Sequence, residues 1–126
     1  MDLYRQLILD HYKHPHHFGE LKNPDIKKTF FNSACGDKIT ITLRIKGKKI
    51  DQIQFIGEGC AISIASASLL TDEAEGKETS RVLEMDLKTI TNLLQTDLTP
   101  SRVKCALLPL EAIQQSILEL KKSKMV

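Results

Sequence analysis

The chain carries three cysteines, and each lies beside an expected break in regular structure. Cys35 lies within the turn-like segment 32–37, Cys60 directly follows Gly57-Glu58-Gly59, and Cys105 comes shortly after Pro100. A thiolate is both a nucleophile and a metal ligand, and glycine leaves backbone room for an ion or a sulfur donor. In a sandwich of sheet and helices the three junctions can meet at one end. We therefore expect a single shared site.

Asp37 adds a carboxylate to these thiols, two residues after the first cysteine. Three thiolates and one carboxylate form a donor set that suits zinc or a cluster iron. Two cations, Arg102 and Lys104, precede Cys105 and favour its thiolate form. Simpler explanations remain open, because a free cysteine is often a buried apolar filler and Asp is common in turns. The filler explanation is strongest for Cys105, which is followed by Ala106.

Composition sets the class of protein. The 126 residues are 41% apolar, so we expect one domain spanning 1–126. No apolar run approaches the roughly 20 residues of a membrane span, and the N-terminus lacks a secretory signal pattern, so we expect a cytoplasmic protein with no membrane role. An odd number of cysteines in a reducing compartment argues against disulfides. The net charge is only +2, so we expect no nucleic-acid partner.

Hydrophobic periodicity predicts an α+β fold. An apolar stripe indicates an N-terminal helix that ends before Pro15. Alternating apolar residues indicate two paired strands, and with a candidate strand before them they predict an antiparallel meander. Further helices follow: one from Cys60 with many small residues, a short one near Ser80, one capped by Asp86, and a last one beginning near Pro109. We therefore expect a three-stranded antiparallel sheet packed against several helices, with the N-terminal helix first and a long C-terminal helix last. The predicted strands are 29–32, 39–45 and 50–56, with a tight turn at 46–49.

At these motifs the sequence resembles the U-type iron–sulfur cluster assembly proteins, the family of IscU, SufU and the N-terminal domain of NifU. The resemblance covers nearly the whole chain and implies a SufE/NifU-like sandwich. Its most specific part is the segment 57–68 around the second cysteine. The matching segments are Leu3-Tyr4-Arg5-Gln6, Asp10-His11-Tyr12 with Pro15, Cys35-Gly36-Asp37, Gly57-Glu58-Gly59-Cys60-Ala61-Ile62-Ser63 with Ala65-Ser66-Ala67-Ser68, and Arg102-Val103-Lys104-Cys105.

The resemblance implies a role in iron–sulfur cluster assembly. Members accept sulfur from a cysteine desulfurase as a cysteine persulfide, and they either build a transient [2Fe–2S] cluster or hold zinc. The resemblance assigns metal or cluster binding to Cys35, Asp37, Cys60 and Cys105. It assigns sulfur acceptance to Cys105 in the IscU branch and to Cys35 in the SufU branch. The implied partners are the desulfurase and downstream cluster-receiving proteins, and a weak homodimer is left open.

Two features bear on the branch within the family. The Arg-x-Lys-Cys sequence ending at Cys105 is closer to the SufU branch, because the IscU branch has histidine where this chain has Lys104. The segment 75–100, however, is too short for the insertion that the SufU branch usually carries. Whether the chain is a scaffold or a sulfurtransferase-like acceptor is therefore open at this point.

Three other interpretations stay open. The cysteines could form a structural zinc module without sulfur chemistry, or one could be the nucleophile of a hydrolase with a distant base. Four histidines near Pro15 could form a second metal site, although a helix stripe and a polar loop explain them more simply. These histidines are His11, His14, His16 and His17.

Overall fold

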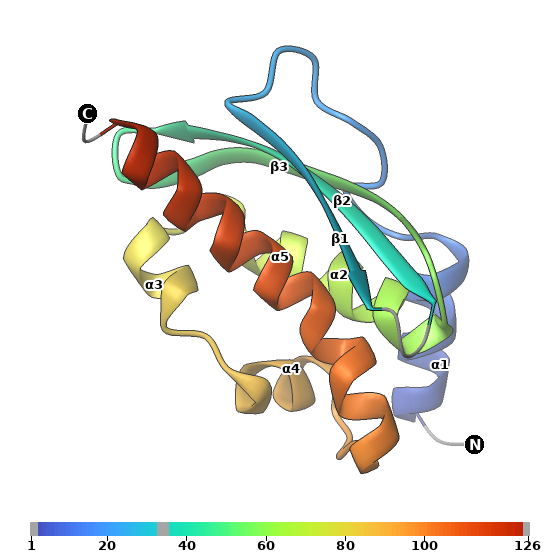
Figure 1. The fold of residues 1–126 in the computed structure, drawn as a ribbon. Helices are drawn as coiled ribbons and strands as arrows, with labels where there is room; N and C mark the ends of the chain where they lie inside the picture. Colours follow the sequence, from blue (N-terminus) through green and yellow to red (C-terminus); the bar gives the residue numbers. More distant parts are fainter. Residues whose placement is uncertain (1–2, 33–35, 125–126) are drawn as a thin grey trace.

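A computed structural model describes residues 3–32 and 36–124 of the chain (Figure 1). Within these residues the helices and strands follow the predicted order, with a helix first, then a sheet, then further helices. The strands are β1 (Ile26–Asn32), β2 (Asp37–Lys46) and β3 (Lys49–Glu58). The helices are α1 (Leu3–Lys13), α2 (Ala61–Ala74), α3 (Thr79–Leu83), α4 (Leu87–Leu94) and α5 (Pro100–Lys124).

The three strands form one antiparallel sheet in the order β1-β2-β3, which confirms the predicted meander. Ile39, Ile41 and Leu43 of β2 are fully buried and Ile45 is partly buried, as a period of two predicts for a strand that faces the core. Gly47 makes the tight turn into β3 with a positive φ of 65°, a conformation that glycine adopts without steric cost. The register pairs Asn32 with Asp37 and Lys38 with Glu58. The start of β2 and the ends of its two neighbours therefore share one end of the sheet.

Helices α2 and α5 cover one face of this sheet (Figure 1). Small side chains line the buried part of α2, which lets the helix approach its neighbours closely. At the crossing with α5, the Ser66 hydroxyl donates a hydrogen bond of 2.9 Å to the Ala106 carbonyl. Asp86 caps α4 with a complete capping box to Thr89, as predicted. None of the helices in the described part of the chain has the length and apolar character required to cross a membrane.

The loop between α1 and β1 lies along the free edge of β3. The Gly19 N–H donates to the Phe55 carbonyl at 2.8 Å, and the Phe55 N–H donates to the His17 carbonyl at 2.9 Å. Farther on, the Leu21 N–H donates to the hydroxyl of Thr42 on the outer face of β2. The loop thus satisfies backbone groups that an edge strand would otherwise expose.

The prediction that the last helix begins near Pro109 was wrong. Helix α5 begins at Pro100 and continues through Pro109. Proline is tolerated in the first turn, where its missing N–H would have had no intrahelical partner. An interior proline costs about 3 kcal/mol, but Leu108 and Leu110 on either side are buried in the core. Tertiary packing thus outweighs local propensity, and Cys105 lies inside α5 rather than before the last helix.

Candidate metal centre

Three of the four predicted ligands lie together at one end of the sheet. One potential ligand atom from each of Asp37, Cys60 and Cys105 lies within 4.8 Å of the other two. Asp37 is the first residue of β2, Cys60 is the N-cap of α2, and Cys105 lies in the second turn of α5. Cys35 belongs to residues 33–35, which lie outside the described part of the chain, so its place in the set remains a prediction from the sequence.

The chain topology explains why these distant residues meet. Because β2 and β3 are antiparallel, the end of β3 lies beside the start of β2, where Asp37 is. The chain leaves β3 at Glu58 and enters α2 only three residues later, which holds Cys60 at the same end of the sheet. Helix α5 then crosses α2 and brings Cys105 to this corner. The sheet register and one helix crossing together place the donors.

The Asp37 carboxylate is arranged as a ligand would be. Its side chain is buried, with the residue only 2% exposed. Oδ1 accepts a hydrogen bond of 3.1 Å from the Cys60 N–H, whereas buried Oδ2 has no hydrogen-bond partner among the described residues. A buried polar atom left unpaired costs about 1–3 kcal/mol. A bound cation would satisfy this oxygen, and two nearby cysteine sulfurs complete a mixed donor set that suits zinc or iron.

Gly59 leaves the room that the carboxylate occupies. A Cβ built on Gly59 would lie 2.4 Å from Asp37 Oδ1 and 2.9 Å from its Cγ, far inside van der Waals contact. The side chain of Asp37 and the backbone of the loop before α2 therefore pack directly against each other. This fit makes glycine necessary at position 59 as long as an aspartate stands at position 37.

Gly59→Ala is expected to weaken zinc binding at least about 10-fold and to destabilise the fold by about 1–3 kcal/mol, because the new methyl group displaces the Asp37 carboxylate. Chelator competition and urea unfolding measure the two effects. The same substitution made in an Asp37→Ala background should cost much less, since Oδ1 and Cγ are gone and only Cβ remains close, at 3.2 Å. Equal costs in both backgrounds would show that the contact with Asp37 is not the cause.

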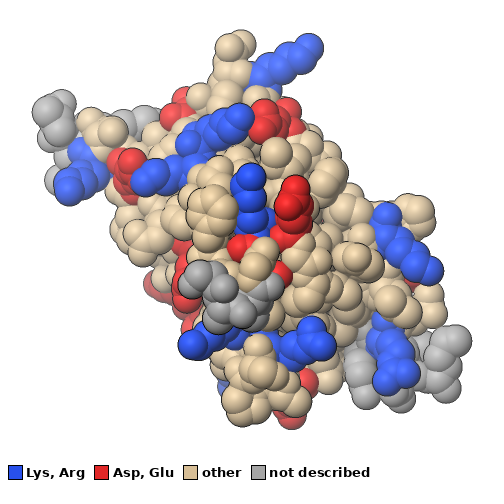
Figure 2. Space-filling view, turned by 45° about the vertical axis from the view of Figure 1, so that its right-hand side comes forward, with Lys and Arg blue, Asp and Glu red and all other residues tan. Residues whose placement is uncertain are grey.

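The two described cysteines differ in access. Cys60 is partly exposed, whereas Cys105 is 3% exposed. The burial of Cys105 agrees with the filler explanation, but its position beside Asp37 and Cys60 agrees with a ligand. Next to Cys60, a hollow lined by Tyr12, Phe18, Glu58 and other residues opens to solvent. Figure 2 shows charged side chains of both signs interspersed over a largely uncharged surface on the face that it displays. Of the two described cysteines, Cys60 is therefore the one in contact with solvent.

Arg102 and Lys104 are exposed on the first turns of α5. Arg102 lines a hollow with Ile62 at the start of α2 and with Ile8 of α1. The described geometry thus places Arg102 near the helix that Cys60 begins. The predicted support of the Cys105 thiolate by the two cations remains a prediction.

The histidines near Pro15 form a second cluster that includes an aspartate from α2. One potential ligand atom from each of His11, His16 and Asp72 lies within 4.8 Å of the other two. Burial lowers the pKa of His11, and the nearby His16 lowers it further, against a smaller opposing effect of Asp72 and Asp10. Sequence reasoning found the histidines but missed Asp72, because the aspartate lies on a different element, 56 residues after His16.

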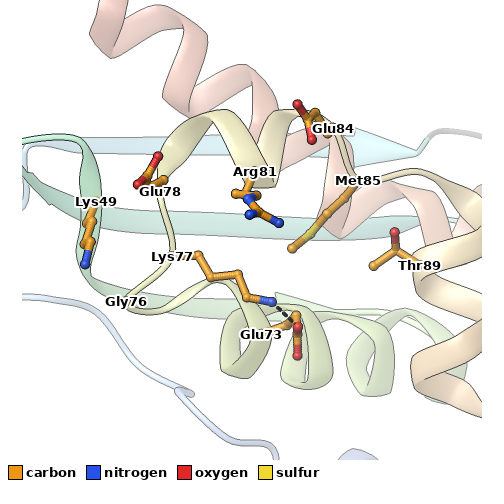
Figure 3. A pocket seen from close by; sticks show the side chains of 9 residues that line it. All are labelled: Lys49, Glu73, Gly76, Lys77, Glu78, Arg81, Glu84, Met85 and Thr89. Atoms are coloured by element: carbon orange, nitrogen blue, oxygen red, sulfur yellow. Dashed lines mark hydrogen bonds and ion pairs between the residues drawn. The ribbon is translucent and has the colours of Figure 1, made fainter.

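Another pocket lies away from both clusters, at the end of α2 and along α3 (Figure 3). In Figure 3 the Lys77 ammonium points to the Glu73 carboxylate, and the two form an ion pair. Arg81 and Met85 also point into this region. Charged side chains of both signs line the pocket, and the residues that line it include no predicted ligand. We therefore do not assign the chemistry of the cysteines to it.

Comparison with known proteins gives consistent results over most of the chain. A zinc-dependent sulfurtransferase SufU of Bacillus subtilis is 36% identical, covering 91% of this chain and 89% of the relative. An iron–sulfur cluster assembly scaffold protein IscU of Streptococcus pyogenes is 33% identical, covering 91% of this chain and 82% of the relative. A crystal structure of a SufU scaffold protein from Fervidobacterium islandicum superposes with a TM-score of 0.76 at 28% identity, covering 89% of this chain and 94% of that one.

The fold is shared more widely than the sequence. The N-terminal part of a NifU-like protein from Brucella abortus superposes with a TM-score of 0.77 at only 18% identity, covering 95% of each chain. The family profile described as the NifU-like N terminal domain matches residues 3–126. This match includes the whole sheet, both helices that cover it and the Asp37–Cys60–Cys105 cluster. The chain therefore belongs to the family of NifU-like N-terminal domains.

Proposed function

We propose that this protein acts in iron–sulfur cluster assembly, accepting sulfur from a cysteine desulfurase at a metal site formed by Cys35, Asp37, Cys60 and Cys105. The observation that carries the proposal is that Asp37, Cys60 and Cys105 each place a potential ligand atom within 4.8 Å of the other two, and that buried Asp37 Oδ2 has no hydrogen-bond partner among the described residues. Relatives named as a zinc-dependent sulfurtransferase and as a cluster assembly scaffold support it.

The residues present fit zinc or a cluster iron. When bound, such a metal would supply charge that stabilises thiolates and holds them in place. Asp37 is a hard oxygen donor among soft sulfur donors, so it is the ligand that exchanges most readily. Its release would leave a coordination position open while the cysteines stay bound. The Cys60 N–H orients the carboxylate through Oδ1 and leaves Oδ2 for the metal.

Sulfur transfer itself needs only a thiolate and a persulfide donor. The thiolate of an acceptor cysteine attacks the outer sulfur of the desulfurase persulfide. A new S–S bond forms on the acceptor, the S–S bond of the donor breaks, and the donor cysteine leaves as a thiolate. The proton of the persulfide stays on the transferred sulfur, and no electrons are gained or lost overall. Of the two described cysteines, Cys60 is the partly exposed one, so its thiolate is the more accessible to a persulfide donor.

The two branches of the proposal differ in what accumulates. A scaffold acquires a visible-absorbing iron–sulfur chromophore when it is given iron, cysteine and desulfurase under anaerobic conditions. A zinc-dependent sulfurtransferase retains zinc, stays colourless and still accelerates the desulfurase. Lys104 before the third cysteine favours the sulfurtransferase branch. The segment 75–100 favours the scaffold branch, because it is too short for the insertion that the SufU branch usually carries.

The experiment that tests the proposal is metal analysis of the purified chain beside its intact mass after incubation with a desulfurase and cysteine. We expect one equivalent of zinc, or the iron of a [2Fe–2S] cluster, at the cysteine site, and a mass gain of whole sulfur atoms that a reductant removes. A structural zinc module would instead keep its metal, gain no sulfur and unfold on chelation, because structural zinc contributes folding energy. That result would overturn the proposal.

A further inference from the structure

A cluster of two imidazoles and one carboxylate lies outside the cysteine site. His11 comes from the last turn of α1, His16 from the loop that follows, and Asp72 from the C-terminal half of α2. One potential ligand atom from each lies within 4.8 Å of the other two. The rings of His11 and His16 have centroids 4.5 Å apart. Imidazole and carboxylate are ligands that zinc, nickel and cobalt accept readily.

The cluster is held by contacts from two sides. The hydroxyl of fully buried Ser68 lies 2.7 Å from Nδ1 of His11 and accepts a hydrogen bond of 2.8 Å from the backbone N–H of His16. One residue further on, the His17 carbonyl accepts from the Phe55 N–H of β3. The loop is therefore fixed to both α2 and the sheet at the point where the histidines stand. Such support positions ligands before an ion arrives.

Contacts from Ser68 and His17 each engage one atom of a candidate ligand, Nδ1 of His11 and Oδ1 of Asp72. Ser68 occupies Nδ1 of His11, and the described contacts give Nε2 of this ring no hydrogen-bond partner. His17 Nε2 lies 2.8 Å from Asp72 Oδ1, which leaves Oδ2 directed to His16. Metal-bound histidines and carboxylates commonly have such hydrogen-bonding partners on their far side. The arrangement thus resembles a ligand shell with its supporting contacts.

His16 and Asp72 are the ligands that can adjust. Their side chains are 54% and 38% exposed, and His16 Nδ1 lies 2.5 Å from Asp72 Oδ2. Two ligands of one tetrahedral ion are about 3.3 Å apart when each bond is about 2.0–2.1 Å. The pair must therefore open by less than one ångström, and exposed side chains can do so without disturbing the core. The ion would take the place of the hydrogen bond between these two atoms.

The local charge favours a cation. With neutral rings, the cluster carries the negative charge of Asp72. Glu75 lies one turn further along, with Oε2 3.5 Å from Nδ1 of His17. The carboxylates of Asp72 and Glu75 thus both face this group of imidazoles. A divalent cation bound here would neutralise this negative charge and leave the site neutral or weakly positive.

From these observations we propose that His11, His16 and Asp72 form a second divalent-metal site, of the zinc, nickel and cobalt class, that is separate from the cysteine site. An ion at this site would fasten the loop after α1 to α2, the helix that Cys60 begins. The site does not depend on the proposed sulfur chemistry. Its expected affinity is lower than that of the cysteine site, because it offers fewer buried ligands and no thiolate.

The test is a zinc titration of the tag-free chain, starting from protein that holds one equivalent. Calorimetry should detect a second, weaker equivalent in the wild type. His16→Ala and Asp72→Asn should each weaken the second binding step at least about 10-fold and leave the first unchanged. His14→Ala is the matched control, since His14 is exposed in the same loop but stands outside the cluster. Both substituted side chains are exposed, so the variants should remain folded, which circular dichroism verifies.

Cobalt separates this site from the cysteine site. Cobalt bound by thiolates shows intense sulfur-to-metal charge-transfer bands, whereas a site of two imidazoles and a carboxylate shows only weak ligand-field bands. We expect the second cobalt equivalent to add ligand-field intensity alone, and to add none in Asp72→Asn. A wild-type chain that binds only one equivalent, or a second equivalent retained in both variants, would overturn the proposal. If only the first metal equivalent, the one at the cysteine site, failed to bind, that result would contradict the proposed function and not this second site.

Discussion

Cys60→Ser is expected to abolish sulfur uptake from a cysteine desulfurase while the fold remains intact or becomes slightly more stable. Cys60 is the N-cap of α2, with extended backbone angles and no capping hydrogen bond from its side chain. Serine is a preferred N-cap residue, so its hydroxyl should stabilise the helix by up to about 1 kcal/mol. The same hydroxyl is a poor nucleophile and a poor ligand for soft metals. Loss of activity would therefore be chemical rather than structural.

The measurement combines desulfurase turnover, intact mass and urea unfolding of the metal-free chain. Stimulation of the desulfurase should fall at least about 100-fold in Cys60→Ser, because the thiolate set is broken. Cys35→Ser and Cys105→Ser should lose activity to a similar degree. Cys105→Ser should also be destabilised by about 1–3 kcal/mol, since it places a hydroxyl at a buried position. Full stimulation in all three variants would refute a role of the cysteines in sulfur transfer.

Asp37→Asn is expected to weaken zinc binding at least about 10-fold with little change in the stability of the metal-free chain. Asparagine keeps an oxygen that can accept from the Cys60 N–H but places an amide NH2 where Oδ2 stands. The NH2 group cannot bind a metal. Because shape and the hydrogen bond are retained, the free energy of unfolding without metal should change by no more than about 1 kcal/mol.

Asp25→Asn is the matched control for this substitution. Asp25 also accepts a hydrogen bond from a backbone N–H, that of Ile45, at 2.7 Å. It directly precedes β1, whereas Asp37 lies at the opposite end of the sheet. Its substitution should leave zinc affinity unchanged when both variants are compared by chelator competition. Equal affinity of Asp37→Asn and the wild type would remove Asp37 from the ligand set.

The sheet and its order could be predicted because the middle strand alternates strictly and a tight turn follows it. Ile39, Ile41 and Leu43 recur at every second position and are all fully buried. The cap at Asp86 was likewise visible, because its chemistry lies within four residues of sequence. The start of α5 could not be predicted in the same way. Pro109 is a local signal for a helix start, and the packing of Leu108 and Leu110 overrides it.

The candidate site was only partly visible in the sequence. Residue type and the surrounding turns suggested Cys60 and Asp37 before their geometry was known, and the structure brings both to Cys105. The sequence did not reveal that Asp37 lies against Gly59, or that Asp72 joins the histidines, because both contacts depend on how separate elements pack. Local patterns therefore identified donors, whereas tertiary packing determines which donors share a site.

The most direct test of the account is zinc X-ray absorption of the chain loaded with less than one equivalent of zinc. We predict a shell dominated by sulfur at about 2.3 Å with one lighter donor at about 2.0–2.2 Å, because three cysteines and Asp37 share the ion. Cys35→Ser should lower the sulfur content by one ligand. A shell made mainly of nitrogen and oxygen would contradict the shared cysteine site.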